Sequence, residues 1–121
     1  MNERPHKRLL VWQHSVEFVG SIYQVTACFP PAEQFGLTSQ IRRAAVSVPA
    51  NIAEGLTRAT ARDKLHFLNI AKASLSELDT LLEITSRIGL LARDKMESMQ
   101  SEVILIQRLL NGLINKIKLS R

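Results

Sequence analysis

Candidate catalytic and metal-binding side chains are sparse in this sequence and lie far apart along it. The three histidines are His6, His14 and His66. His14 and Glu17 share a helix face at three-residue spacing, but a metal ion there would need ligands from another helix. A di-iron bundle requires Glu-x-x-His on two helices and two further glutamates, whereas here the order is reversed and occurs once. The pattern predicts no metal site and makes His14 an ordinary polar surface residue.

Nucleophiles and phosphate-binding loops give no stronger signal for catalysis. No serine lies in a G-x-S-x-G turn. Cys28, the single cysteine, falls near a predicted helix C-terminus, where the helix dipole does not favour a thiolate. Four of the glycines are isolated rather than gathered in a phosphate-binding loop: Gly36, Gly55, Gly89 and Gly112. We therefore predict that the protein is not an enzyme and has no cofactor.

Positive charge is the main chemical feature of the sequence. Lysine and arginine number 16 against 11 acidic residues, a formal net charge of +5. Residues 1–8, 54–64 and 108–121 together hold ten basic and three acidic residues, a net charge of +7, which leaves −2 elsewhere. Clustered cations bind phosphate backbones by counterion release, with little sequence readout. The candidate nucleic-acid-binding residues are Lys7, Arg8, Arg58, Arg62, Lys64, Lys116, Lys118 and Arg121.

A simpler interpretation of these cations stays open. Charged residues at helix ends are often solvated termini, and lysines near a helix C-terminus suit its dipole. Aromatic residues are not interleaved with the cations, so a base-stacking platform is not expected.

Three further charged residues lie in the stretch 37–58. Arg42 and Arg43 are mid-helix and far from the basic segments, so we expect them to bridge helices or subunits. Glu54 lies at the end of the predicted helix, where the negative end of the helix dipole disfavours a carboxylate unless a cation pairs with it. Arg58 or an arginine of another subunit could supply that cation, so a salt bridge is expected to hold the helix end.

Apolar spacing predicts four helices, at about residues 7–28, 37–58, 61–88 and 92–119. The second of these contains Pro49 and many alanines, so we expect a kinked, thin helix on which the others assemble, with Gly55 as its C-terminal stop. Thr60 and Asp63 form a T-x-x-D cap for the third. Short connections favour an all-α, antiparallel up-and-down four-helix bundle. Residues 1–121 are expected to be one domain, with residues 1–6 as a flexible arm.

The apolar stripes are wider than one bundle core requires, which indicates self-association. Residues 9–29 are interrupted by polar side chains and do not predict a membrane span. The N-terminus carries charges without the apolar run of a signal peptide, so a cytoplasmic protein is expected.

Three stretches of the sequence resemble a known family. They are the run QIRRAAVSVPANIAEG, Glu33-Gln34-Phe35-Gly36-Leu37 and Phe67-Leu68-Asn69-Ile70-Ala71. The family is that of four-helix bundles encoded in intervening sequences of bacterial 23S rRNA genes. The resemblance covers roughly residues 9–91. One departure is Ala73, where the family pattern has a glycine.

The resemblance implies ring-like homo-oligomers, with a pentamer favoured. A related group of bundles accompanies the reverse transcriptases of diversity-generating retroelements and binds that enzyme and nucleic acid. The first hypothesis is a non-enzymatic oligomeric bundle that binds RNA or DNA through a basic pole. The alternative is a structural scaffold that recruits another protein and binds no nucleic acid.

Overall fold

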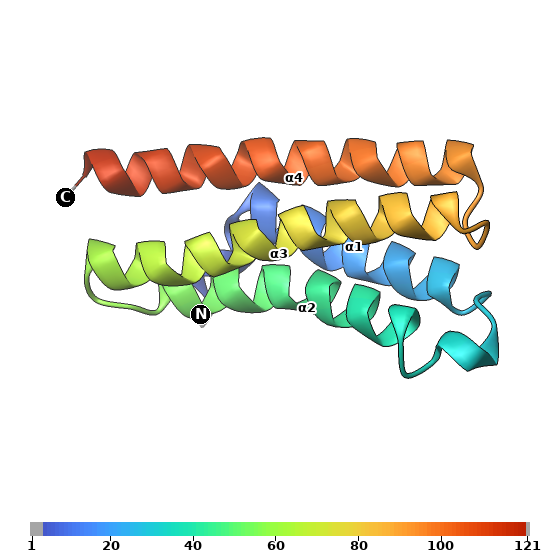
Figure 1. Ribbon diagram of the computed structural model, residues 1–121. Helices are drawn as coiled ribbons and strands as arrows, with labels where there is room; N and C mark the ends of the chain where they lie inside the picture. Colours follow the sequence, from blue (N-terminus) through green and yellow to red (C-terminus); the bar gives the residue numbers. More distant parts are fainter. Residues whose placement is uncertain (1–3, 121) are drawn as a thin grey trace.

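The computed structural model describes residues 4–120 and is all-helical over that range. The elements are η1 (Pro5–Arg8), α1 (Leu10–Thr26), η2 (Pro31–Glu33), α2 (Leu37–Leu56), α3 (Ala61–Arg87) and α4 (Arg93–Leu119). Figure 1 shows the four long helices side by side, with the chain turning at alternate ends so that successive helices run in opposite directions. Each helix contacts its two neighbours around the bundle. The predicted four-helix bundle is confirmed.

The core lies between the inward faces of all four helices. Fully enclosed side chains come from each of them, among them Ile22, Ile41, Ile52, Leu68, Leu75, Leu78, Leu82, Met96, Ile106 and Leu110. The most extensive helix pair is α2 with α3. Ala44 and Ala45 are buried on α2, where their small side chains leave room for neighbouring helices. The interior Pro49 is also buried, inside a continuous α2.

The N-terminal segment differs from the expected flexible arm. Pro5–Arg8 forms a 3-10 helix, and His6 is buried with its ring centroid 5.0 Å from that of Trp12. Leu9 is extended, with φ −82° and ψ 131°, so α1 begins at Leu10 rather than near residue 7. An aromatic contact therefore holds this segment against the bundle. Residues 1–3 of the expected arm lie outside the described range.

Gly55 also has a different role from the predicted helix stop. Helix α2 continues to Leu56, and Gly55 is buried inside it. A Cβ at this position would lie 3.1 Å from the carbonyl oxygen of Lys64 and 3.2 Å from Cβ of Phe67. The missing side chain lets the start of α3 approach α2. The predicted cap at Thr60 is confirmed, since its side chain accepts a hydrogen bond from the Asp63 amide at 3.1 Å.

Arg42 joins α2 to α1, as the sequence predicted for a bridging residue. Its Nε donates to Oγ1 of Thr26 at 2.8 Å, and its guanidinium lies 4.3 Å from the ring centroid of Tyr23. Thr26 is buried and itself donates to the carbonyl oxygen of Ile22 at 2.7 Å. The neighbouring Arg43 is exposed and makes no hydrogen bond or ion pair within residues 4–120. No helix-bridging contact of Arg43 is present among residues 4–120, and a subunit contact stays a prediction.

Replacing Gly55 by alanine should destabilise the fold by about 1–3 kcal/mol, because the added methyl group meets backbone and Cβ atoms that cannot move cheaply. Gly20→Ala is the matched control. Gly20 lies in α1 with no atom within 4 Å of an added Cβ. That variant should gain about 0.5–1 kcal/mol from helix propensity. Chemical denaturation of the two variants and the parent measures both changes, and equal stabilisation by both would contradict the close approach.

Arg42→Ala should lower the free energy of unfolding by about 1–2 kcal/mol, because a hydrogen bond and a cation–π contact are lost together. Arg43→Ala removes the same charge one position away and should stay within about 0.5 kcal/mol of the parent. Thermal and urea unfolding of the pair separates the two arginines. Equal losses would show that Arg42 contributes only its charge.

Candidate nucleic-acid interface

One end of the bundle gathers the segments that carry the predicted basic residues. Helix α2 ends there, α3 begins there and α4 ends there (Figure 1). The η1 segment contacts both α1 and α2. Arg62 and Lys118 are exposed near the start of α3 and the end of α4. We call the described cations of this region, Lys7, Arg8, Arg58, Arg62, Lys64, Lys116 and Lys118, the basic end.

Two adjoining surface grooves show that these cations come from distant segments. Lys64 and Lys116 line one groove together with Pro5, so α3, α4 and η1 meet there. Arg8 and Lys116 line the second, between the start of α1 and the end of α4. Tertiary contact thus brings three of the predicted cations to adjoining grooves, namely Arg8, Lys64 and Lys116. Arg121, the last of the predicted residues, lies outside the described range.

Two of the basic residues are already engaged by the fold. Arg58 forms an ion pair with Glu54, and its guanidinium lies 4.6 Å from the ring centroid of Phe67 on α3. Lys64 is half-buried, and its Nζ donates to the carbonyl oxygen of Leu56 at 3.4 Å, near the end of α2. The expected salt bridge of Glu54 is therefore present, with Arg58 as its partner. Both cations help to join α2 to α3, which reduces what they can offer to a ligand.

Four exposed cations of the basic end are better placed to contact a polyanion. The side chains of Lys7, Arg62, Lys116 and Lys118 are exposed. They come from η1, α3 and α4 rather than from one helix face. Such a distribution favours contacts with several phosphates along a backbone, and it offers no ordered set of donors for reading bases.

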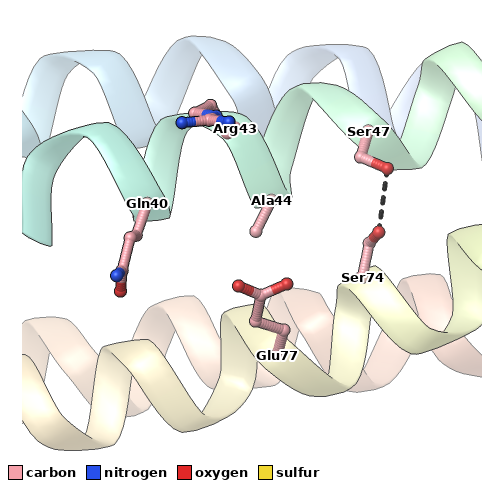
Figure 2. Close-up of a pocket in the computed structure, with 6 residues that line it drawn as sticks. All are labelled: Gln40, Arg43, Ala44, Ser47, Ser74 and Glu77. Carbon is pink, nitrogen blue, oxygen red and sulfur yellow. Dashed lines mark hydrogen bonds between the residues drawn. The ribbon is translucent and has the colours of Figure 1, made fainter.

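A third groove, which is polar, lies between α2 and α3, away from the basic end. Figure 2 shows the Gln40 side chain and the Glu77 carboxylate pointing into it, while Arg43 lies over α2 away from Glu77. Ser74 Oγ donates to Ser47 Oγ at 2.8 Å and closes one side of the groove. Asn51 Nδ2 also donates to Ser47 Oγ at 2.9 Å, so both serine hydroxyl groups take part in hydrogen bonds within the fold.

The surface formed by α3 and α4 is occupied by internal polar contacts. Arg87 Nε donates to Glu83 at 2.9 Å, and Gln100 Nε2 lies 3.5 Å from the same carboxylate. These hydrogen bonds lower the pKa of Glu83 below its ordinary value. Because the lowered pKa favours the ionised form, any stabilisation from this contact is present at neutral pH and is lost as the pH falls through that pKa.

Residues 4–120 contain no group of three histidine, cysteine or acidic side chains placed to hold a metal ion. His14 is half-buried on α1 rather than fully exposed. None of the described helices is long and apolar enough to cross a bilayer.

Sequence reasoning missed the apolar character of the basic end. Leu9, Leu113 and Ile117 line the groove that Lys64 and Lys116 border. Leu109 and Leu113 were visible as part of a wide apolar stripe on the last helix. Nothing in their spacing showed that α1 would begin late and leave them partly uncovered.

Comparison with known proteins places the fold in a family. A protein of unknown function from the S23 ribosomal protein family of Bacteroides thetaiotaomicron has a similar crystal structure, with a TM-score of 0.81 and 28% sequence identity. The alignment covers 88% of this chain and 96% of that protein. No functionally curated protein matches the sequence. The family of 23S rRNA-intervening sequence proteins matches residues 7–112, most of the chain. By this match, and by its four-helix fold, the chain belongs to the 23S rRNA-intervening sequence protein family.

Proposed function

We propose that this protein is a non-enzymatic homo-oligomer, a closed ring with a pentamer favoured, that binds RNA or DNA through its basic end. The observation that supports the proposal is that exposed Arg62, at the start of α3, lies at the same end of the bundle as exposed Lys116 and Lys118, at the end of α4 (Figure 1). Cations from separate segments, held on helices, present a fixed positive surface to a phosphate backbone.

Exposed apolar side chains on α1 and α2 support the oligomer. Val16, Tyr23 and Val46 are 40%, 42% and 43% exposed, on two helices that contact each other. Phe35, on the turn before α2, is 91% exposed. Side chains of this kind are enriched at the centres of protein interfaces, where charged residues are depleted. Because each contact in a cyclic ring joins two different faces, the face formed by α1 and α2 is proposed as one half of the subunit contact.

Ring symmetry would strengthen the electrostatic attraction. In a cyclic ring every subunit points the same way, so the basic ends lie on one face. Each added subunit contributes its exposed cations, and counterion release grows with the number of phosphates contacted. Binding of this kind is steeply salt-dependent and tolerant of sequence.

Nucleic-acid binding is tested by fluorescence anisotropy with labelled RNA and DNA over a salt series. If about four phosphates are neutralised, the affinity for duplex DNA should fall roughly a hundredfold between about 50 and 200 mM salt. Charge reversal of Lys116 and Lys118 to glutamate should weaken binding at least about tenfold at low salt.

The matched control reverses Lys72 and Lys95, which are exposed and lie outside the basic end. This double variant has the same net charge as the first and should bind nearly as the parent does. Equal weakening by both variants would indicate a general charge effect, and salt-independent binding would contradict the electrostatic mechanism.

Analytical ultracentrifugation tests the ring. The parent should sediment as an assembly several times heavier than the 13.6 kDa chain. Val16→Glu combined with Val46→Glu should give a folded monomer, because two charges would be buried in the contact. Lys95→Glu, at an exposed polar position in the first turn of α4, should remain assembled. A parent that sediments as a monomer would exclude the ring.

A further inference from the structure

The bundle is incomplete at its basic end. Helices α3 and α4 each have 27 residues, whereas α1 has 17. Figure 1 shows α3 and α4 extending past the start of α1 toward the end of the molecule that carries the C-terminus. The described chain provides only the short η1 on this side of α4. The last turns of α4 therefore have no α-helical neighbour where α1 would otherwise lie.

The space left by the late start of α1 is a shallow apolar channel. The two grooves have volumes of about 360 and 280 Å³ and share Leu9, Leu113 and Lys116, so they form one continuous depression along α4. We call it the α4 channel. Leu10, which is 59% exposed, stands at one edge, and Ile117 lies toward the C-terminal end. An apolar strip of this kind is the surface that an amphipathic helix covers.

Charge along the channel decides which kind of helix fits. Lys116 lines both grooves, Arg8 lines the groove between α1 and α4, and Lys64 lines the groove that Pro5 also lines. A phosphate backbone would use these cations but would leave the leucine-lined floor uncovered, because it has no apolar surface to place there. A helix with an apolar stripe and flanking acidic residues would satisfy both parts of the surface at once.

We propose that the α4 channel binds an acidic amphipathic helix supplied by a different protein. A second copy of this chain fits poorly. A two-fold contact would oppose the same cations, and in a ring contact none of its four α-helices would offer a net charge below −1. The site would make the protein a scaffold that holds a helical partner beside α1 and α4. This inference does not depend on nucleic-acid binding or on the ring.

The probe is a designed, fluorescein-labelled peptide of about 18 residues with leucines at i, i+3, i+4 and i+7 and glutamates on both flanks. A scrambled peptide of the same composition lacks the apolar stripe and serves as the ligand control. Fluorescence anisotropy should give saturable binding of the amphipathic peptide, and the scrambled peptide should bind at least about tenfold more weakly.

Two pairs of matched variants locate the contact on the protein. Leu10→Gln and Lys116→Glu change residues that line the channel, and each should weaken peptide binding about tenfold. Leu119→Gln and Lys118→Glu make the same chemical changes at exposed positions that do not line it, and they should alter affinity less than about twofold. Leu10 and Leu119 are 59% and 87% exposed, so neither substitution opens the core. Circular dichroism verifies that each variant is folded.

The outcomes separate this proposal from the others. Selective loss with Leu10→Gln and Lys116→Glu supports the channel, and unchanged nucleic-acid binding by Leu10→Gln shows that the two activities differ. Equal binding of the scrambled peptide would reduce the effect to charge and overturn the proposal. Absence of peptide binding would also overturn it, as would channel variants that change the sedimenting mass, since a second copy would then cover the surface.

Discussion

The close approach of α2 and α3 is the constraint on which the rest of the structure depends. It requires a residue without a side chain at Gly55, because Lys64 and Phe67 already occupy the space that a Cβ would need. Farther along the same pair, Ser47 and Ser74 are in hydrogen-bond contact. Small residues at these positions let two long helices share an extensive interface, and the remaining helices complete the bundle against it.

The close approach of α2 and α3 also determines which contacts the cations beside the α2–α3 turn make. With α2 held against α3, Arg58 reaches both Glu54 and the ring of Phe67, and Lys64 reaches the carbonyl group of Leu56. Cations that look available in the sequence thus serve partly to join the helix ends. A charged group that holds a helix end has less freedom to contact a ligand, so the proposed binding of a polyanion would depend on η1, Arg62 and the end of α4.

The end of α4 combines two kinds of surface that are usually separate. Lys116 belongs to the positive surface and also borders leucines that α1 leaves uncovered. Positive charge alone suits a polyanion, whereas positive charge beside an apolar floor suits an acidic amphipathic helix. The leucines are uncovered because α1 starts late, which is a property of helix length rather than of residue type. The late start therefore makes the proposed contact with an acidic amphipathic helix possible.

Local signals in the sequence were enough to predict the class of fold and most helix limits. The three- and four-residue apolar spacing, the Thr60 cap and the short connections could be read directly, because periodicity and caps are local signals in the sequence. The same reasoning located the ion pair of Glu54 with Arg58, since residues four apart share a helix face.

The tertiary structure alone decided what depends on contacts between distant segments. Gly55, which the sequence predicted as the end of the second helix, lies inside α2 at its contact with α3. Lys64 and Phe67 come close to Gly55 only after folding. The tertiary structure made Arg42 a bridge and left its neighbour Arg43 exposed, since side-chain direction against α1 separates them. It ordered His6 against Trp12 and started α1 at Leu10. Sequence periodicity shows which face of a helix is apolar, but only packing shows how much of that face a neighbour covers.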